Sequence, residues 1–113
     1  MECVFCGIVA GQIPGNIIYC TDLVTAFRDV NPVAPSHVLI VPNRHLVSTE
    51  DLSLEEHNLA GQLLLAVKEV ARLEGIMESG YRVIINTGPN GHQEVQHLHI
   101  HVVGGRPMHN KIG

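Results

Sequence analysis

The chain has 113 residues, 45% of them hydrophobic, with seven Lys or Arg against eleven Asp or Glu and a formal net charge of −4. This length suits one core, and we expect residues 1–113 to form a single domain. The acidic balance argues against nucleic acid as a partner, because phosphate neutralisation needs clustered Lys and Arg. No apolar run approaches the 18 or so residues of a membrane helix, so no membrane partner is expected.

Cys3 and Cys6 form a Cys-x-x-Cys pair near the start of the chain, and a short apolar turn or helix follows them. Two thiolates at this spacing supply half of a tetrahedral zinc site, whose other ligands must come from elsewhere. A thioredoxin-like redox motif needs a preceding strand, which does not fit before residue 3. Two ordinary reduced cysteines remain the alternative. Three cysteines in all, and no signal-peptide pattern, predict a cytoplasmic protein.

Three β-strands are expected in the first part of the chain. Residues 16–19 and 24–28 are β-rich runs at hairpin spacing, and Cys20 between them is expected to be a small buried or strand residue. Asp29 follows as a turn residue, or as a carboxylate placed to accept hydrogen bonds from a ribose. Residues 37–42 form a nearly continuous apolar run, which predicts a central strand buried on both faces.

One long helix is predicted from Ser53 to about Glu74. Ser53 and Glu56 match a capping box, and Gly75 is the expected C-cap. Its apolar positions are Leu59, Leu63, Val67, Val70 and Leu73, widened by Ala60, Leu64 and Ala71. This face is wider than packing on a sheet requires, so we expect a twofold homodimer in which the helix meets its own copy.

The next predicted elements are a strand over residues 80–86 and a ten-residue loop over 87–96, which leads into the last strand. The loop is longer than a hairpin needs, and its glycines allow several amide N–H groups to point at one anion.

The last strand is predicted in the stretch 97–103, where His97, His99 and His101 alternate with aliphatic residues. Strand side chains alternate between faces, so the three imidazoles are expected to form one row. Such a row can hold a metal, bind an anion, or supply a nucleophile with its proton partners. The alternative, a solvent-exposed polar face, is weaker for three histidines in register.

These residues together resemble the histidine triad (HIT) family, in its branch of small histidine-triad nucleotide-binding proteins. The resemblance covers nearly the whole chain. It rests on Cys3–Cys6, residues 26–29, 31–32 and 34–37, Val41-Pro42 with His45, Tyr81-Arg82 with Asn86, and residues 93–106. It implies an α+β fold with an antiparallel sheet of about five strands and one long helix, and a sheet extended across a homodimer.

The resemblance also implies a nucleotide hydrolase that cleaves purine nucleoside 5′-phosphoramidates, or similar nucleotidyl compounds, through a covalent nucleotidyl-histidine intermediate. His99 matches the nucleophile of the family. His101 matches the position that contacts the phosphate oxygens and assists proton transfer. The alternatives are a dinucleoside polyphosphate hydrolase of the same family and a non-catalytic nucleotide-binding or scaffold protein.

The ligand implied by the resemblance is a purine nucleotide similar to AMP. Its nucleoside pocket would comprise Val4, Phe5, Phe27, Asp29 and Val30, and its phosphate site Asn86, Gln93, Glu94, Val95, His99 and His101. Many family members have a glycine in place of His92 and a Ser or Thr in place of Glu94. Because a carboxylate repels a phosphate, we assign the contact at position 94 to the backbone N–H.

A structural zinc ion is the cofactor that the resemblance implies. Cys3, Cys6, His45 and His97 match the four positions through which some bacterial-type members bind zinc. In that case zinc removes His97 from proton chemistry. The alternative places His97 in the catalytic network.

Overall fold

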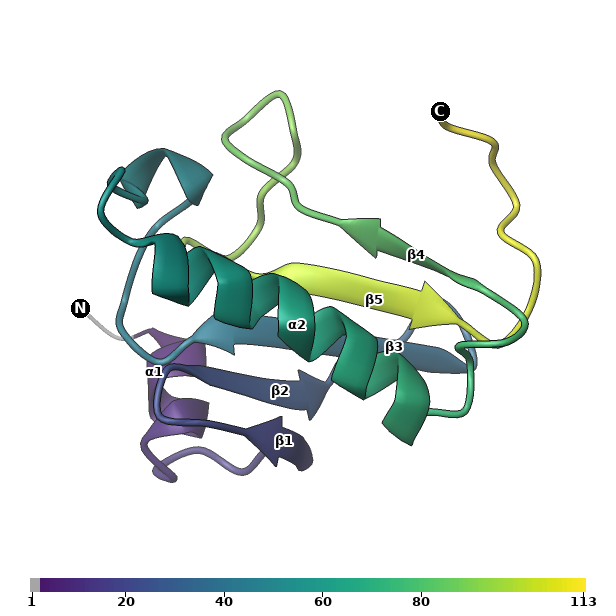
Figure 1. Cartoon of the computed structure of the whole chain (residues 1–113), viewed down its shortest axis with the longest axis horizontal. Helices are drawn as coiled ribbons and strands as arrows, with labels where there is room; N and C mark the ends of the chain where they lie inside the picture. The colour runs from purple at the N-terminus through teal and green to yellow at the C-terminus, as the bar shows by residue number, and fades with distance from the viewer. Residues whose placement is uncertain (1–2) are drawn as a thin grey trace.

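The computed structural model describes residues 3–113 (Figure 1). The elements are α1 (Val4–Val9), β1 (Ile17–Cys20), β2 (Val24–Arg28), β3 (Ser36–Pro42), the 3₁₀ turn η1 (Thr49–Asp51), α2 (His57–Leu73), β4 (Tyr81–Ile84) and β5 (Ile100–Gly104). The strands form one sheet in the order β1-β2-β3-β5-β4, and every neighbouring pair is antiparallel. The predicted α+β fold, with five strands and one long helix, is confirmed.

The central strand β3 is buried along its whole length because both faces of the sheet are covered there. Val38 and Ile40 belong to the core under α2, whereas Leu39 and Val41 pack with Phe5 of α1 in a second cluster. The two faces of β3 therefore contact different helices, as its unbroken apolar run predicts.

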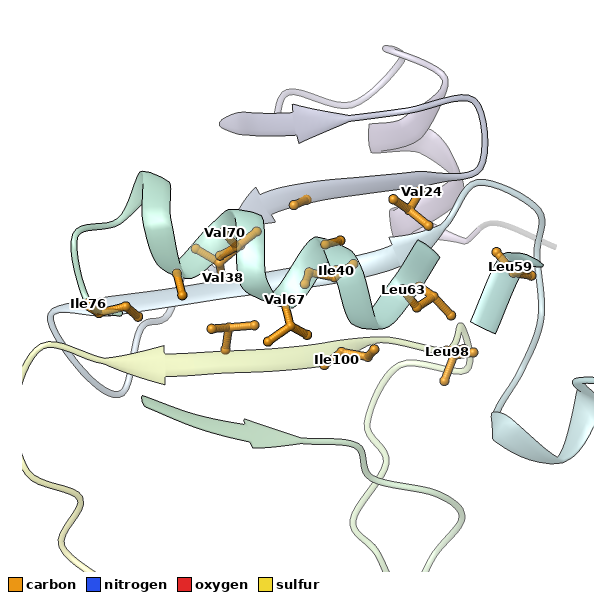
Figure 2. Packing of buried hydrophobic residues seen from close by; sticks show 14 of the residues in the cluster. Val24, Val38, Ile40, Leu59, Leu63, Val67, Val70, Ile76, Leu98 and Ile100 are labelled. Carbon is orange, nitrogen blue, oxygen red and sulfur yellow. The ribbon is translucent and has the colours of Figure 1, made fainter. Parts of the chain in front are cut away.

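The main core lies between α2 and the sheet (Figure 2). Leu59, Leu63, Val67 and Val70 of the helix pack against strand residues such as Ile40, and all are at most 8% exposed. Burying one such side chain contributes about 1.5–3 kcal/mol. The helix is therefore held by its apolar face more than by its intrinsic propensity. Within residues 3–113, no helix is long and apolar enough to cross a membrane.

The N-terminus of α2 differs from the prediction, since the helix begins at His57 and not at Ser53. The Glu56 carboxylate accepts the Ser53 N–H at 3.0 Å, which is half of a capping box, but it also pairs with Arg44. Residues 53–56 form a separate turn, and Glu56 is the N-cap of α2. At the other end the helix stops at Leu73 with Glu74 as its C-cap, and the predicted C-cap, Gly75, follows one residue later at φ 71°.

Two strand boundaries also differ from the prediction. β4 ends at Ile84, and β5 begins at Ile100, so His97 and His99 precede the strand. β3 pairs with β5 only as far as Ile40 opposite Ile100, and β3 ends at Pro42, which has no N–H to donate. Instead, the Leu98 N–H donates to the Leu46 carbonyl at 2.7 Å. Cys20 ends β1 and is exposed.

Candidate active site

A row of side chains crosses the face of the sheet opposite α2. Phe27 pairs with Leu39, Leu39 with His101, and His101 with Ile84, and directly opposed residues share a face. Leu39 belongs to the cluster that packs against α1, so this row lies on the α1 side. His99 lies two residues before His101 and joins the same face.

A cavity of about 380 Å³ opens over this row, within the usual range of about 300–1,000 Å³ for small-molecule sites. It brings together every residue predicted to contact a nucleotide except Gln93, namely Val4, Phe5, Phe27, Asp29, Val30, Asn86, Glu94, Val95, His99 and His101. Residues 13–15 after α1 also line it, and sequence analysis did not single them out. Their position depends on the path of a loop, which leaves no periodic pattern.

The His99 ring is fixed by one short hydrogen bond. Its Nδ1 lies 2.7 Å from the His97 carbonyl oxygen, which can only accept, so Nδ1 carries the proton. Nε2 therefore holds the lone pair. The residue is 6% exposed, lines the cavity, and meets the edge of the Phe5 ring at a centroid distance of 5.2 Å. A buried imidazole with a fixed lone pair is suited to act as a nucleophile.

A second chain of hydrogen bonds fixes the tautomer of His101. The Val33 N–H donates to His37 Nδ1 at 3.2 Å, so neutral His37 carries its proton on Nε2. That Nε2–H donates to His101 Nδ1 at 2.9 Å, which places the remaining proton of His101 on Nε2. His101 therefore presents an N–H donor in a cavity where His99 presents a lone pair.

Burial keeps this pair of rings neutral. Burial, followed by the neighbouring His99 and His37, lowers the pKa of His101 to about 4. Burial also lowers the pKa of His37, and the Asp29 carboxylate 3.4 Å away opposes that effect. Sequence analysis missed the role of His37. Alternation along β3 carried the signal, since His37, Leu39 and Val41 share a face, but the apolar residues on both faces concealed it.

The loop before β5 departs from the prediction at Gln93. Its side-chain oxygen accepts the Gly88 N–H, its side-chain amide donates to the Val47 and Val95 carbonyls, and its backbone N–H donates to the Gly88 carbonyl. Gln93 therefore braces the loop and does not line the cavity. His92 does line it, at φ 58°, a conformation that glycine adopts most readily.

Cys3, Cys6, His45 and His97 converge beside this cavity, as predicted, with one donor atom from each within 4.8 Å of the others. Cys3 Sγ lies 3.3 Å from His97 Nδ1, and Cys6 Sγ lies 3.3 Å from His45 Nδ1 and 3.5 Å from His97 Nδ1. A tetrahedron with bonds of about 2.0–2.3 Å separates its ligands by about 3.3–3.8 Å. The four side chains therefore fit one tetrahedral ion.

The protonation of this cluster also suits a metal. The His97 Nε2–H donates to the Pro42 carbonyl at 2.9 Å, which leaves a lone pair on the Nδ1 that faces the thiols. Burial lowers the pKa of His97, so its ring is neutral as a ligand must be. Burial, followed by the adjoining Cys3 thiol, raises the pKa of Cys6, and a bound cation would stabilise its thiolate.

The fold and the site define a small α+β protein with a histidine-lined pocket on one face of its sheet. A family model for the HIT domain matches residues 10–108, and the chain therefore belongs to the HIT family. It is 46% identical over 107 residues to the purine nucleoside phosphoramidase of Escherichia coli K12, covering 95% of this chain and 90% of that protein.

Two further relatives agree with this assignment. The chain is 45% identical over 107 residues to a 14 kDa zinc-binding protein of Zea mays, covering 93% of this chain and 83% of that one. The solved structure of a histidine triad protein from Clostridium difficile superposes with a TM-score of 0.93 at 40% identity, covering 99% and 97% of the two chains. The predicted family is thus confirmed.

Proposed function

We propose that this protein is a hydrolase that cleaves the P–N bond of purine nucleoside 5′-phosphoramidates, with His99 as the nucleophile. The observation that carries the proposal is the hydrogen bond from His99 Nδ1–H to the His97 carbonyl, which leaves Nε2 free to attack. The similarity to a purine nucleoside phosphoramidase supports the choice of substrate.

The reaction has two steps. First, His99 Nε2 attacks the α-phosphorus while the P–N bond breaks and the departing amine takes a proton from water. The neutral His101 ring donates a hydrogen bond from its Nε2–H to the departing nitrogen. The imidazolium formed at His99 keeps its Nδ1–H on the His97 carbonyl, which stabilises the new charge. Second, a water molecule attacks the phosphorus and releases a proton to solvent, which balances the proton taken up in the first step. The histidine–phosphorus bond breaks, and the nucleoside monophosphate leaves.

The nucleoside end of the cavity is both aromatic and acidic. Phe5 and Phe27 stand edge to face at a centroid distance of 5.3 Å, and both line the cavity, where they would pack against a base. The Asn31 N–H donates to Asp29 Oδ1 at 2.8 Å, which orients the carboxylate toward a ribose. The purine preference remains part of the proposal.

The charge of the cavity favours an amine over a polyphosphate as leaving group. Among residues 3–113, the carboxylates that line the cavity are Asp29 and Glu94. The one lining arginine or lysine of that range, Arg28, is paired with Glu74. A polyphosphate leaving group would bring several negative charges close to Glu94. We therefore rank the phosphoramidase above a dinucleoside polyphosphate hydrolase.

A structural zinc ion is part of the proposal. Cys3, Cys6, His45 and His97 would hold it, and the bound ion would cross-link three chain segments and contribute to the folding free energy. Elemental analysis of protein purified without a histidine tag should give about one zinc per chain. Less than about a tenth of an equivalent, with no thermal destabilisation by a chelator, would contradict this.

A homodimer through β4 completes the proposal. β4 is an edge strand, and Val83 is 40% exposed on the α2 side, since it pairs with the core residue Val102. Val67 points toward β5 in Figure 2, and Leu64, one turn earlier on that flank of α2, is 64% exposed. Pairing of two β4 strands would extend the sheet and cover both residues.

Steady-state hydrolysis of adenosine 5′-phosphoramidate tests the function. We expect turnover that depends on His99, with slower hydrolysis of diadenosine tetraphosphate. His99→Ala should bind AMP but keep less than a few per cent of the activity, because the imidazole forms the intermediate and is only one of several phosphate contacts. AMP binding without turnover by the wild-type protein would instead support a binding or scaffold role.

A further inference from the structure

Helix α1 contacts the Cys–His cluster and the cavity at the same time. Cys3 is its N-cap and Cys6 lies in its first turn, so both thiols of the cluster belong to this helix. Phe5 lies between them in sequence and reaches the cavity, where its ring meets the rings of His99 and Phe27 edge to face. The two sites therefore share one short element.

The position of α1 depends on few interactions. It has six residues, too few for a helix that is stable alone. Its residues Phe5 and Ile8 are buried in the second apolar cluster, which also contains Leu39 and Val41. The thiols at its N-terminal end contact His45 and His97. An ion bound to all four side chains would tie α1 to the segment after β3 and to the segment before β5.

His97 provides a second link between the two sites. Its ring faces the thiols through Nδ1, while its backbone carbonyl accepts the Nδ1–H of His99. The Phe5 ring also meets the His97 ring, at a centroid distance of 5.9 Å. Ordering of His97 by an ion would thus restrain the partner that fixes the His99 tautomer.

We propose that Phe5 is a positioning residue that couples the two sites, so that zinc in the Cys–His cluster strengthens nucleotide binding in the cavity. With the ion bound, α1 is fixed and Phe5 stands against His99 and the base. Without the ion, α1 must become ordered when the nucleotide binds, and the free-energy cost of this ordering weakens binding. Because coupling free energy is reciprocal, the nucleotide must strengthen zinc binding by the same factor. This proposal rests on the proposed function of the same cavity.

The test is a thermodynamic cycle on the full chain. Calorimetry gives the AMP dissociation constant for zinc-loaded protein freed of unbound metal and for chelator-treated protein. Competition with a chromophoric chelator gives the zinc affinity with and without AMP. We expect each ligand to bind at least about fivefold tighter in the presence of the other. Phe5→Leu should still bind zinc but bring this ratio close to one.

The controls separate the possible failures. Cys20→Ser removes the exposed thiol outside the cluster and should leave the ratio unchanged, whereas Cys6→Ser should bind AMP as the metal-free wild type does. Equal AMP affinity with and without bound zinc, no zinc binding, or a full ratio in Phe5→Leu would each overturn the coupling and leave the hydrolase proposal standing. Absence of AMP binding in both forms would overturn the proposed function itself.

Discussion

Substitution of His37 tests the assignment of His101 as the hydrogen-bond donor to the leaving group. His37 is 6% exposed and joins the Val33 N–H to His101 Nδ1 through hydrogen bonds of 3.2 and 2.9 Å. His37→Leu removes the donor to His101. In His37→Gln the side-chain amide can still donate from nearly the same place, although it cannot titrate. The two variants differ mainly in whether the His101 tautomer is fixed.

The expected effect follows from the strength of that hydrogen bond. A hydrogen bond contributes about 0.5–1.5 kcal/mol net, so its loss should reduce the productive tautomer by roughly two- to tenfold. We expect kcat of His37→Leu to fall by about this factor. His101 Nδ1 then lies unpaired, which should lower the free energy of unfolding by about 1–3 kcal/mol.

Two substrates distinguish a role at the leaving group from a general loss of structure. An alkylamine phosphoramidate of AMP needs a proton on its leaving group, whereas the p-nitrophenyl ester of AMP does not. His37→Leu should slow the first and spare the second, and His37→Gln should restore the first to within about threefold of wild type. Equal losses on both substrates, or no loss on either, would refute this reasoning.

Three other predictions concern pH, leaving-group charge and assembly. The pKa of His101 is about 4 in the folded chain against an ordinary 6.5, so the unfolded chain binds the proton first as pH falls. The free energy of unfolding, measured with urea, should therefore decrease as the pH falls from about 6.5 to about 4. This dependence on pH should be weaker in His101→Asn, and an unchanged dependence would contradict the lowered pKa of His101. In Glu94→Ser, the kcat/KM for diadenosine tetraphosphate divided by the kcat/KM for the phosphoramidate should rise about fivefold, because a negative charge near the leaving group is removed. An unchanged ratio would show that the carboxylate does not face the leaving group. Val83→Lys should convert a sedimenting dimer to the 12.3 kDa monomer, and a persistent dimer would exclude the β4 edge.

The strands and their faces follow largely from the sequence because they depend on a short period. The unbroken apolar run at β3 predicts burial on both faces, and the alternation from Leu98 to Val102 places His99 and His101 opposite the core. The clustering of Cys3, Cys6, His45 and His97 was also predicted, because Cys-x-x-Cys has a fixed spacing and the family resemblance supplied the two histidines. Local spacing was sufficient for the strands and their faces, whereas the cluster also needed the resemblance.

The remaining features depend on contacts that spacing does not encode. The role of His37 requires the register of β3 against β5, which sets Leu39 opposite His101. The inward position of Gln93 involves hydrogen bonds with the Gly88 N–H and with the Val95 and Val47 carbonyls, the last on a distant segment. The start of α2 at His57 accompanies the pairing of the Glu56 carboxylate with Arg44, from another segment. In each case a contact between distant segments accompanies the departure from the local signal.

The most direct test of the account is to trap the covalent intermediate. Wild-type protein is mixed rapidly with an adenosine phosphoramidate, quenched in alkali to preserve the phosphorus–nitrogen bond, and mapped by peptide mass spectrometry. The account predicts that an adenylyl group appears on His99 before AMP is released. Formation of AMP with no protein adduct at any mixing time, or an adduct on another residue, would contradict it.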